Sequence, residues 1–508
     1  MGSLQVATRF ICLLAKLFRR CIRSYMSKIM NSRISVLLSI VLGANLALSS
    51  LDGVFAAEAE NVVETQDLQH LLTAQQKELV ALQDMISLQQ SQIDQQRELL
   101  RTVQLRLHQL SAAQKTGPEP MVDREPAKRN ELDEAFAARP ESTKLGDDFS
   151  DSIPIPGTDA AVKFGGFVKM SMVRTFDPLG VDDRFITALI PVENTQDISD
   201  LGKFSVTARQ SRFGFEMRDL TPYGTLRAYI EGDYAGSGDT FRLRHAFAQF
   251  RNYLVGETWS TIVDNRATPE EVDFEGINGR IQVRQPQLRY FPSFGRHLDL
   301  LIGLEDPAPD VTGGVGVSEY PDFIASIRRT WANRWHFKSS VLLRQIQAQW
   351  DLDPAVTDQQ FAWGVSVSGN VGVGFWDERD NIMFQFNYGD GIGRYINDLQ
   401  EAGGQDAVFN PQTGVLETIP VFSGYIAFQH WWRETLRSTV TYSWVDVNNL
   451  EFQDDSAYAH TDRAIVNLFW SPVPRIDLGT EFLWGARENK DGANGIARQF
   501  QLSAKYRF

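Results

Sequence analysis

The chain has 508 residues, of which 43% are hydrophobic, and its formal net charge at neutral pH is −14. This acidity argues against nucleic acid as a partner, because a protein that binds phosphates needs a basic surface. No run of about 18 apolar residues occurs after about residue 60, which excludes a transmembrane helix there but leaves a β-barrel possible, since barrel strands alternate apolar and polar residues.

The first segment, residues 1–56, is predicted to be a secretory signal peptide. Basic residues precede the apolar run ISVLLSIVLGANLAL at 34–48, and a small-residue cleavage site follows at 54–56. The basic stretch before the run is long for a signal peptide, so Met26 or Met30 is a candidate for the true start. An uncleaved membrane anchor is the alternative interpretation.

Cleavage at this site would change both the cysteine content and the charge. Both cysteines, Cys12 and Cys21, lie in the signal, so the rest of the chain has no disulfide or thiol chemistry. Residues 57–508 hold 43 Lys and Arg against 63 Asp and Glu, a net charge of −20.

Residues 60–115 are predicted to form a coiled coil. Apolar residues recur every seven positions, as a coiled-coil seam requires: Leu72, Leu79, Ile86, Ile93, Leu100 and Leu107. Glutamines at other core positions would specify register or oligomer state. A single amphipathic helix packed on the rest of the protein is the alternative. Residues 116–160 are rich in Pro and charge and are predicted to be a flexible linker.

Residues 161–508 read as short alternating strands. Sixteen candidates occur, at 162–173, 203–217, 224–234, 240–250, 253–261, 279–290, 296–304, 322–331, 333–346, 360–373, 379–389, 421–431, 436–446, 461–470, 474–485 and 496–508. The gaps between them alternate between short and long. An even strand number with tight turns at one end and large loops at the other predicts a 16-stranded antiparallel transmembrane β-barrel. A β-sandwich has no reason to alternate loop length in this way.

Charged residues share one face of many of these strands. A dry core would have to pair every one of these charges, so the pattern favours a water-filled lumen. Within 203–217 the apolar phase changes, and a β-bulge near Gln210 and Ser211 would bring Arg209 and Arg212 to the same inner face. Pro286 is expected to shift the phase within 279–290 in the same way.

Arginines dominate the inner face in the first half of the predicted barrel. Beside the two arginines at the bulge, neighbouring strands contribute an arginine wall made of Arg227, Arg242, Arg244, Arg280, Arg284 and Arg289. Such a wall would bind carboxylate or phosphate and favour anions. Simple charge balance against nearby acidic residues is the alternative.

The long link at 257–278 is predicted to be a constriction loop. It carries five acidic residues that could face the arginine wall across the lumen: Asp264, Glu270, Glu271, Asp273 and Glu275. An ordinary solvated external loop is the alternative.

The stretches FGGFVKMSM, ARQSRFGFE, LRHAFAQF, GETWSTIVD, DFEG, VRQPQLRY and the final QLSAKYRF together resemble the DcaP-like outer-membrane porins, near the phosphate-selective porins. The resemblance implies a homotrimer of 16-stranded barrels that passes small anionic solutes such as dicarboxylates. It also implies that the coiled coil lies in the periplasm. The arginines of this chain that match the motifs of the family are Arg209, Arg212, Arg244, Arg284 and Arg289. The last stretch, with Tyr506 and Phe508, resembles the signal that the barrel-assembly machinery reads.

An outer-membrane enzyme is the first rival function. No HExxH or GxSxG motif occurs, so no catalytic residue, metal or cofactor is expected. A secreted β-sandwich or adhesin on a coiled-coil stalk is the second rival. We therefore expect a passive porin in the outer membrane, surrounded by lipid and lipopolysaccharide, with small anions as solutes and no nucleic acid as partner.

Overall fold

The computed structural model describes residue 149 and residues 151–193, 202–331, 335–403 and 405–508. The predicted signal peptide, the predicted coiled coil and most of the predicted linker lie outside these residues. No helix in the described part of the chain has the length and apolar character needed to span a bilayer.

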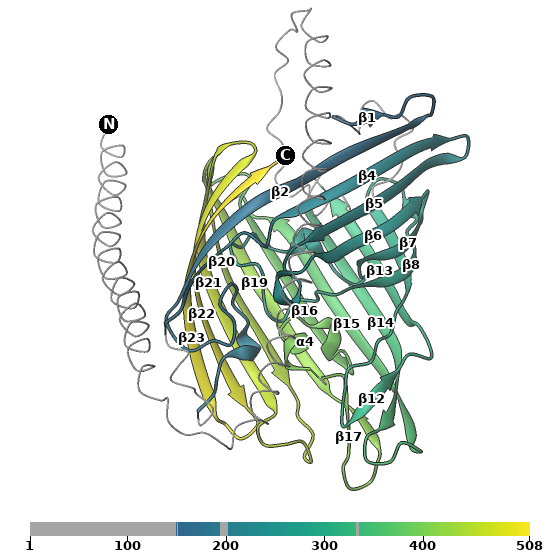
Figure 1. Cartoon of the computed structure of the whole chain (residues 1–508), viewed down its shortest axis with the longest axis vertical. Helices are drawn as coiled ribbons and strands as arrows, with labels where there is room; N and C mark the ends of the chain where they lie inside the picture. The colour runs from purple at the N-terminus through teal and green to yellow at the C-terminus, as the bar shows by residue number, and fades with distance from the viewer. Residues whose placement is uncertain (1–148, 150, 194–201, 332–334, 404) are drawn as a thin grey trace, which may run out of the picture. The chain divides into compact units, whose positions relative to one another are not determined.

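The described chain forms a sixteen-stranded antiparallel β-barrel (Figure 1). The wall strands are β2 (Ala160–Thr175), β3 (Phe204–Thr207) continued by β4 (Arg212–Thr221), β5 (Gly224–Asp233), β6 (Arg242–Phe250), β7 (Tyr253–Trp259), β8 (Arg284–Tyr290), β10 (Leu298–Glu305), β13 (Asp322–Trp331), β14 (Trp335–Trp350), β15 (Thr357–Gly372), β16 (Asn381–Asp390), β19 (Pro420–Arg433), β20 (Leu436–Val447), β21 (Tyr458–Val473), β22 (Ile476–Asn489) and β23 (Asn494–Arg507).

The barrel closes between its first and last strands. The ladder between β2 and β23 runs from Phe167 opposite Arg507 to Thr175 opposite Gln499. Beyond this ladder the last residue is still paired, because the Phe508 amide donates to the Gly166 carbonyl at 3.2 Å. Closure removes the unpaired edges that an open sheet would leave.

The two ends of the barrel differ, as the sequence predicts. Two-residue turns join β4 to β5, β6 to β7, β19 to β20 and β21 to β22, whereas residues 260–283, 306–321 and 391–419 form long loops at the other end. Two of the predicted long loops are shorter than expected. Strand pairing continues into them and leaves only 351–356 and 490–493 as connections.

The predicted bulge in the second wall strand is present. Thr207 pairs with Ser171 and Arg212 pairs with Phe167, so four residues of this strand lie opposite three of β2. The predicted phase shift at Pro286 is wrong, because the ladder between β7 and β8 runs in unbroken register from Arg284 to Tyr290. Proline tolerates this position because β7 pairs there without needing its amide proton.

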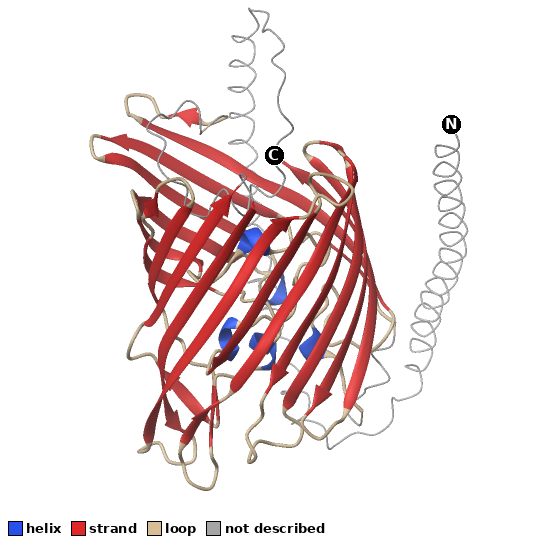
Figure 2. Cartoon of the chain, turned by 180° about the vertical axis from the view of Figure 1, so that it is seen from behind, coloured by secondary structure: helices blue, strands red, loops and turns tan. Residues whose placement is uncertain are grey.

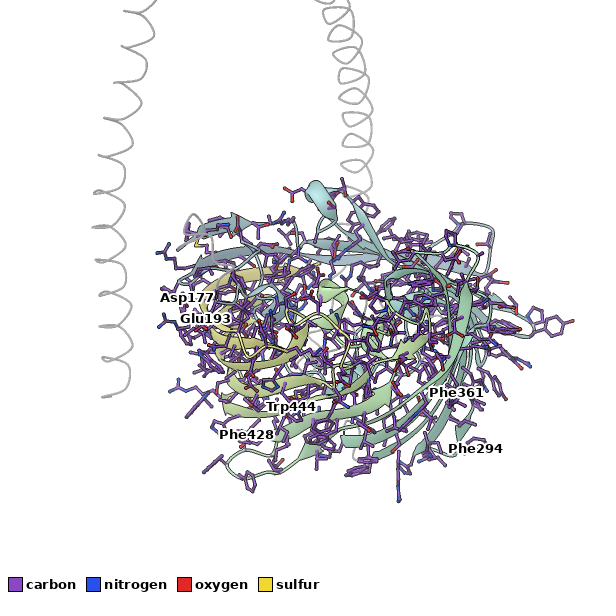
Figure 3. All side chains as sticks on the ribbon, turned by 90° about the horizontal axis from the view of Figure 1, so that it is seen from below. Asp177, Glu193, Phe294, Phe361, Phe428 and Trp444 are labelled. Atoms are coloured by element: carbon purple, nitrogen blue, oxygen red, sulfur yellow. The ribbon has the colours of Figure 1, made fainter. Side chains whose placement is uncertain are left out.

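The barrel wall alternates as expected, with apolar side chains outside and polar ones inside. On β14, Phe337 and Val341 are exposed, while His336, Lys338 and Arg344 are buried. Figure 3 looks along the barrel and shows aromatic side chains such as Phe361 on its outer surface, away from the lumen.

The lumen is not simply filled with water. The long loops fold into it, and Figure 2 shows their short helices enclosed by the strands, including η1 (Thr187–Leu189), η4 (Asn265–Ala267), η5 (Gly393–Tyr395) and α4 (Leu399–Ala402). Their apolar residues, with inward residues of β13 and β14 such as Ile324 and Leu342, form a buried cluster. Part of the inner face is therefore a packed core, which the strand patterns did not indicate.

Candidate functional site

A cavity of about 560 Å³ lies inside the barrel, between the loop at 260–283, which we call the inner loop, and the wall formed by β2, β4, β6 to β8 and β23. Charged side chains dominate its lining. The cations are Lys169, Arg184, Arg212, Arg242, Arg244, Arg280, Arg284, Lys505 and Arg507, and the acids are Glu257, Glu270, Glu271, Asp273, Glu275, Glu401 and Asp477.

Two arginines on this wall are held by carboxylates of β5. Arg242 binds Asp233 through Nε and Nη2 at 3.1 and 3.0 Å. Arg244 binds Glu231 and Asp233, each at 3.0 Å. A register shift between β5 and β6, where Gly232 and Glu231 pair with Leu243 and His245, leaves Arg244 as the extra residue. This second bulge places both arginines beside the same carboxylates.

Arg284 differs from these arginines. Its guanidinium lies over the Trp259 ring, with Cζ 5.2 Å from the ring centroid. The structure gives it no ion pair with any described residue. Its Nη1 is buried without a hydrogen-bond partner there. Arg284 is therefore a cation in the cavity whose charge is not neutralised by a bound carboxylate.

Arg284 reaches the cavity because the wall ladder is interrupted beside it. Pairing between β6 and β7 ends at Ala246 opposite Glu257. Beyond this point β6 pairs only with β5, and Trp259 pairs only with Arg284 of β8. Glu257, Trp259 and Arg284 alternate with the inward side chains of β7 and β8, so in an unbroken wall they would face outward. At this break they line the cavity instead.

Acids of the inner loop pair with arginines on the far wall. Arg463 on β21 binds Glu271 and Asp273, through Nη1 and Nη2 at 3.1 and 3.0 Å. Arg437 on β20 binds both carboxylate oxygens of Glu270. The charge of these acids is therefore largely compensated on the side opposite the arginine wall.

The backbone of the inner loop is fixed to the wall as well. The amides of Val272 and Asp273 donate to the Glu481 carboxylate at 2.9 and 3.0 Å. Lys169 donates to the Val272 carbonyl at 2.6 Å, and Lys338 donates to the Thr261 carbonyl at 2.8 Å. Charged donors hold these carbonyls more strongly than neutral ones would.

Several carboxyl groups of the inner loop have shifted pKa values, and Glu275 and Asp264 show the two opposite outcomes. Burial, reinforced by Asp273 and Glu401, raises the pKa of Glu275 to about 7 even though Arg184 lies 3.5 Å away. Burial would also raise the pKa of Asp264, but its contacts with His336, Lys338 and Ser368 hold that pKa below its usual range.

The structure brings together most, but not all, of the site residues expected from the sequence. Those that line the cavity are Arg212, Arg242, Arg244, Arg280, Arg284, Glu270, Glu271, Asp273 and Glu275. Arg280 lies in the loop rather than in the predicted strand 279–290, because residues 281–282 pair with Tyr395 and Ile396 instead of a wall strand.

The other predicted residues take part in networks outside the cavity. Arg227 binds Glu216 at 2.8 Å. Arg289 donates to Thr261 at 3.0 Å, and Arg209 binds Asp183 at 3.0 Å. Asp264 binds His336 on β14.

At the C-terminus, Tyr506 and Phe508 are exposed at 48% and 49%.

Several cavity residues were not expected: Lys169, Arg184, Phe274 and Lys505 line it, and Arg437 and Arg463 neutralise its acids. The alternation of side chains along the strands did indicate that Arg437 and Arg463 face the inside of the barrel. Both alternate with exposed apolar residues of their strands, such as Val440 and Val466. Loop residues such as Arg184 gave no periodic signal.

Comparison with known proteins identifies a matching family. A family described as the DcaP outer membrane protein matches residues 127–508. No curated protein matches the chain.

Among solved structures, the outer membrane channel DcaP of Acinetobacter baumannii matches with a TM-score of 0.61 and 23% identity, over 70% of this chain and 99% of that one. This likeness establishes the fold. The anion-selective porin from Comamonas acidovorans has a TM-score of 0.46 and 11% identity, over 69% of this chain and 100% of that one. Trimeric OmpT of Vibrio cholerae has a TM-score of 0.43 and 12% identity, over 69% and 99%. The last two scores are too low to support an argument.

Proposed function

Because this chain belongs to the DcaP outer membrane protein family, and is therefore a channel of the bacterial outer membrane rather than an enzyme, we propose that it conducts small hydrophilic anions by passive diffusion. Dicarboxylates are the solutes that we expect to pass best. The proposed path runs through the cavity between the arginine wall and the inner loop, which acts as the constriction.

The observation that carries this proposal is that the charge of Arg284 is not paired with a carboxylate of the described chain. Arg242 and Arg244 share two carboxylates of β5, but Arg284 has no ion pair with any described residue. A half-buried cation without a counterion is costly, and a passing anion would relieve that cost. Guanidinium edges bind carboxylates with two parallel hydrogen bonds, which suits a solute with carboxylate groups.

The acidity of the chain does not contradict an anion path. Three of the inner-loop acids that face the cavity, Glu270, Glu271 and Asp273, are compensated by Arg437 and Arg463 on the far wall. Ion selectivity depends on the charges that line the narrow part of a pore rather than on the net charge of the protein.

We further propose that the protein is a homotrimer in the outer membrane. The ladder between β6 and β7 ends at Glu257, although β7 continues to Trp259, which pairs with Arg284. Within the described chain, the backbone of β7 beyond Glu257 therefore has no strand partner on the β6 side. Lipid hydrocarbon cannot satisfy such groups, so a second copy is a better neighbour for this side of the barrel. The heptads at 60–115 support a periplasmic coiled coil that would join three chains.

Other partners follow from the surface and the C-terminus. Exposed aromatic residues on the outer face, such as Phe361 and Trp432, suit contact with lipid and lipopolysaccharide. We propose that Tyr506 and Phe508 present the signal for the barrel-assembly machinery.

The experiment that tests the function is conductance of the purified, detergent-extracted protein in a planar lipid bilayer, with a KCl gradient across it. Current steps in groups of three, with a reversal potential that reports chloride preference, are the expected result. Steps with a preference for potassium would refute the anion assignment but leave the channel intact. Well-folded protein that gives two-step or single-step groups would refute the trimer.

A further inference from the structure

Phe274 projects from the inner loop into the cavity, between Asp273 and Glu275 in the sequence. Its ring lies within cation–π distance of three guanidinium groups. The ring centroid is 5.4 Å from Cζ of Arg184, 5.9 Å from that of Arg212 and 5.7 Å from that of Arg242. These arginines come from three separate elements: the loop after β2, the start of β4 and the start of β6.

The two acids on either side of Phe274 in the sequence do not neutralise Arg242. Asp273 binds Arg463 at 3.0 Å, and Glu275 lies 3.5 Å from Arg184. Arg242 instead takes its counterion from β5, where Asp233 holds it. The aromatic ring thus meets Arg242 from the side of the inner loop, while the carboxylate that neutralises Arg242 lies on the wall.

Arg212 lies farther from the carboxylates of β5 than Arg242 and Arg244 do. Its guanidinium nitrogens are 3.9 Å from a carboxylate oxygen of Glu231 and 4.0 Å from one of Asp233. Arg244 and Arg242 take up these carboxylates at 3.0 Å. The Arg212 guanidinium also lies over a second aromatic ring, that of Phe167, with Cζ 5.3 Å from the ring centroid.

We propose that Phe274 is a positioning residue for the anion path, an inference that rests on the proposed function. The ring supports the faces of Arg212 and Arg242 and separates both from the carboxylates of the inner loop. An aromatic face holds a guanidinium without using any of its N–H donors, so the edge of the group can stay directed toward the cavity. Without the ring, these arginines would turn toward Asp273 and Glu275, and their charges would cancel within the protein.

The test is the reversal potential and single-channel conductance of full-length variants in a KCl gradient. Phe274→Leu removes the ring but keeps most of the bulk, and Phe274→Tyr keeps the ring. For Phe274→Leu we expect the ratio of anion to cation permeability to fall about threefold, as the loss of exposed cation–π contacts predicts. The conductance should stay close to that of the wild type, and Phe274→Tyr should retain the ratio.

The control is Phe294→Leu, which changes an exposed aromatic residue on β9 (Ser293–Phe294) outside the cavity and should leave both measurements unchanged. Phe274→Met provides a second non-aromatic variant if Phe274→Leu does not fold. A wild-type ratio in both non-aromatic variants would overturn the inference while the proposed function stands. Loss of the ratio in Phe274→Tyr would also overturn it. A wild-type channel without anion preference would instead refute the proposed function.

Discussion

His336 on β14 and Asp264 in the inner loop form a fully buried pair, with Nε2 of the histidine 2.8 Å from Oδ2 of the aspartate. Ser368 on β15 donates to the same oxygen at 2.6 Å. The pair joins the beginning of the loop to the wall, and the acids that line the cavity follow in the next eleven residues. This contact is therefore one of those that hold the acids in place, beside the bonds of the loop to Glu481 and Lys169.

Asp264→Asn should loosen the inner loop. The pKa of Asp264 is held below its usual range by His336 although burial opposes this, so its stabilisation is fully present above about pH 4 and is lost as pH falls further. Removing the negative charge breaks a buried charged contact with His336 and Lys338, at about 3–5 kcal/mol. We expect protease cleavage within 260–283 at neutral pH. Asp454→Asn, on an exposed loop, is the control, and equal resistance of both variants would contradict the anchor.

Arg463→Met should shift selectivity toward cations. Arg463 is buried and binds both Glu271 and Asp273, so its loss leaves two carboxylates beside the cavity without their counterion. The negative potential that results attracts cations and repels anions. The reversal potential in a KCl gradient measures the change. Arg498→Met removes an arginine that pairs with Asp177 and is half exposed, and it should have no effect. An unchanged potential in Arg463→Met would show that these acids do not act on the path.

The barrel could be predicted from the sequence because its determinants are local. Alternation fixed the two faces of strands such as 224–234, and the phase change at Gln210 predicted a bulge that the structure contains. The family resemblance was confirmed by the match over 127–508. Where strand boundaries moved, as at 279–283, backbone pairing with Tyr395 and Ile396 outweighed the local pattern.

The interior was much less predictable, because it depends on contacts between residues far apart in the sequence. Leu342 on β14 belongs to an apolar cluster with Ile392 and Leu399 of a long loop, which no strand pattern reveals. The sequence pattern assigned Arg227 and Arg284 to the same arginine wall and gave no reason to distinguish them. The first is neutralised by Glu216, whereas the second lines the cavity at a break in the ladder.

Arg284→Gln should lower anion selectivity with little change in stability. Arg284 has no ion pair in the described chain, so its removal strands no carboxylate. One charge acting at contact distance in a wet pore is worth about 1 kcal/mol, or roughly a fivefold change in the permeability ratio. The reversal potential and the thermal unfolding midpoint measure the two effects. Arg328→Gln is the matched control, because Arg328 is bound to Asp299 at 2.9 Å outside the cavity lining. A fall in the midpoint without a change in selectivity would assign Arg284 a purely structural role.

The selectivity of the channel should depend on pH near neutrality through Glu275. Burial raises the pKa of this carboxyl group to about 7, above its ordinary value, so its contribution to stability is fully present below about pH 4 and is lost as pH rises through 7. Over the same range a negative charge appears in the cavity. We expect the anion-to-cation permeability ratio of the wild type to fall by roughly twofold between about pH 6 and pH 8.

Glu275→Gln should keep the high ratio of acidic pH over this whole range, since the amide does not ionise. Asp377→Asn is the control, because Arg379 lowers the pKa of Asp377 to about 2, far from the range tested. If Glu275→Gln keeps the pH dependence of the wild type, the titrating group lies elsewhere. Asp273, whose pKa burial also raises, would then be the next carboxyl group to replace. If the wild type shows no pH dependence, the Glu275 carboxylate does not contribute to the field that a passing ion experiences.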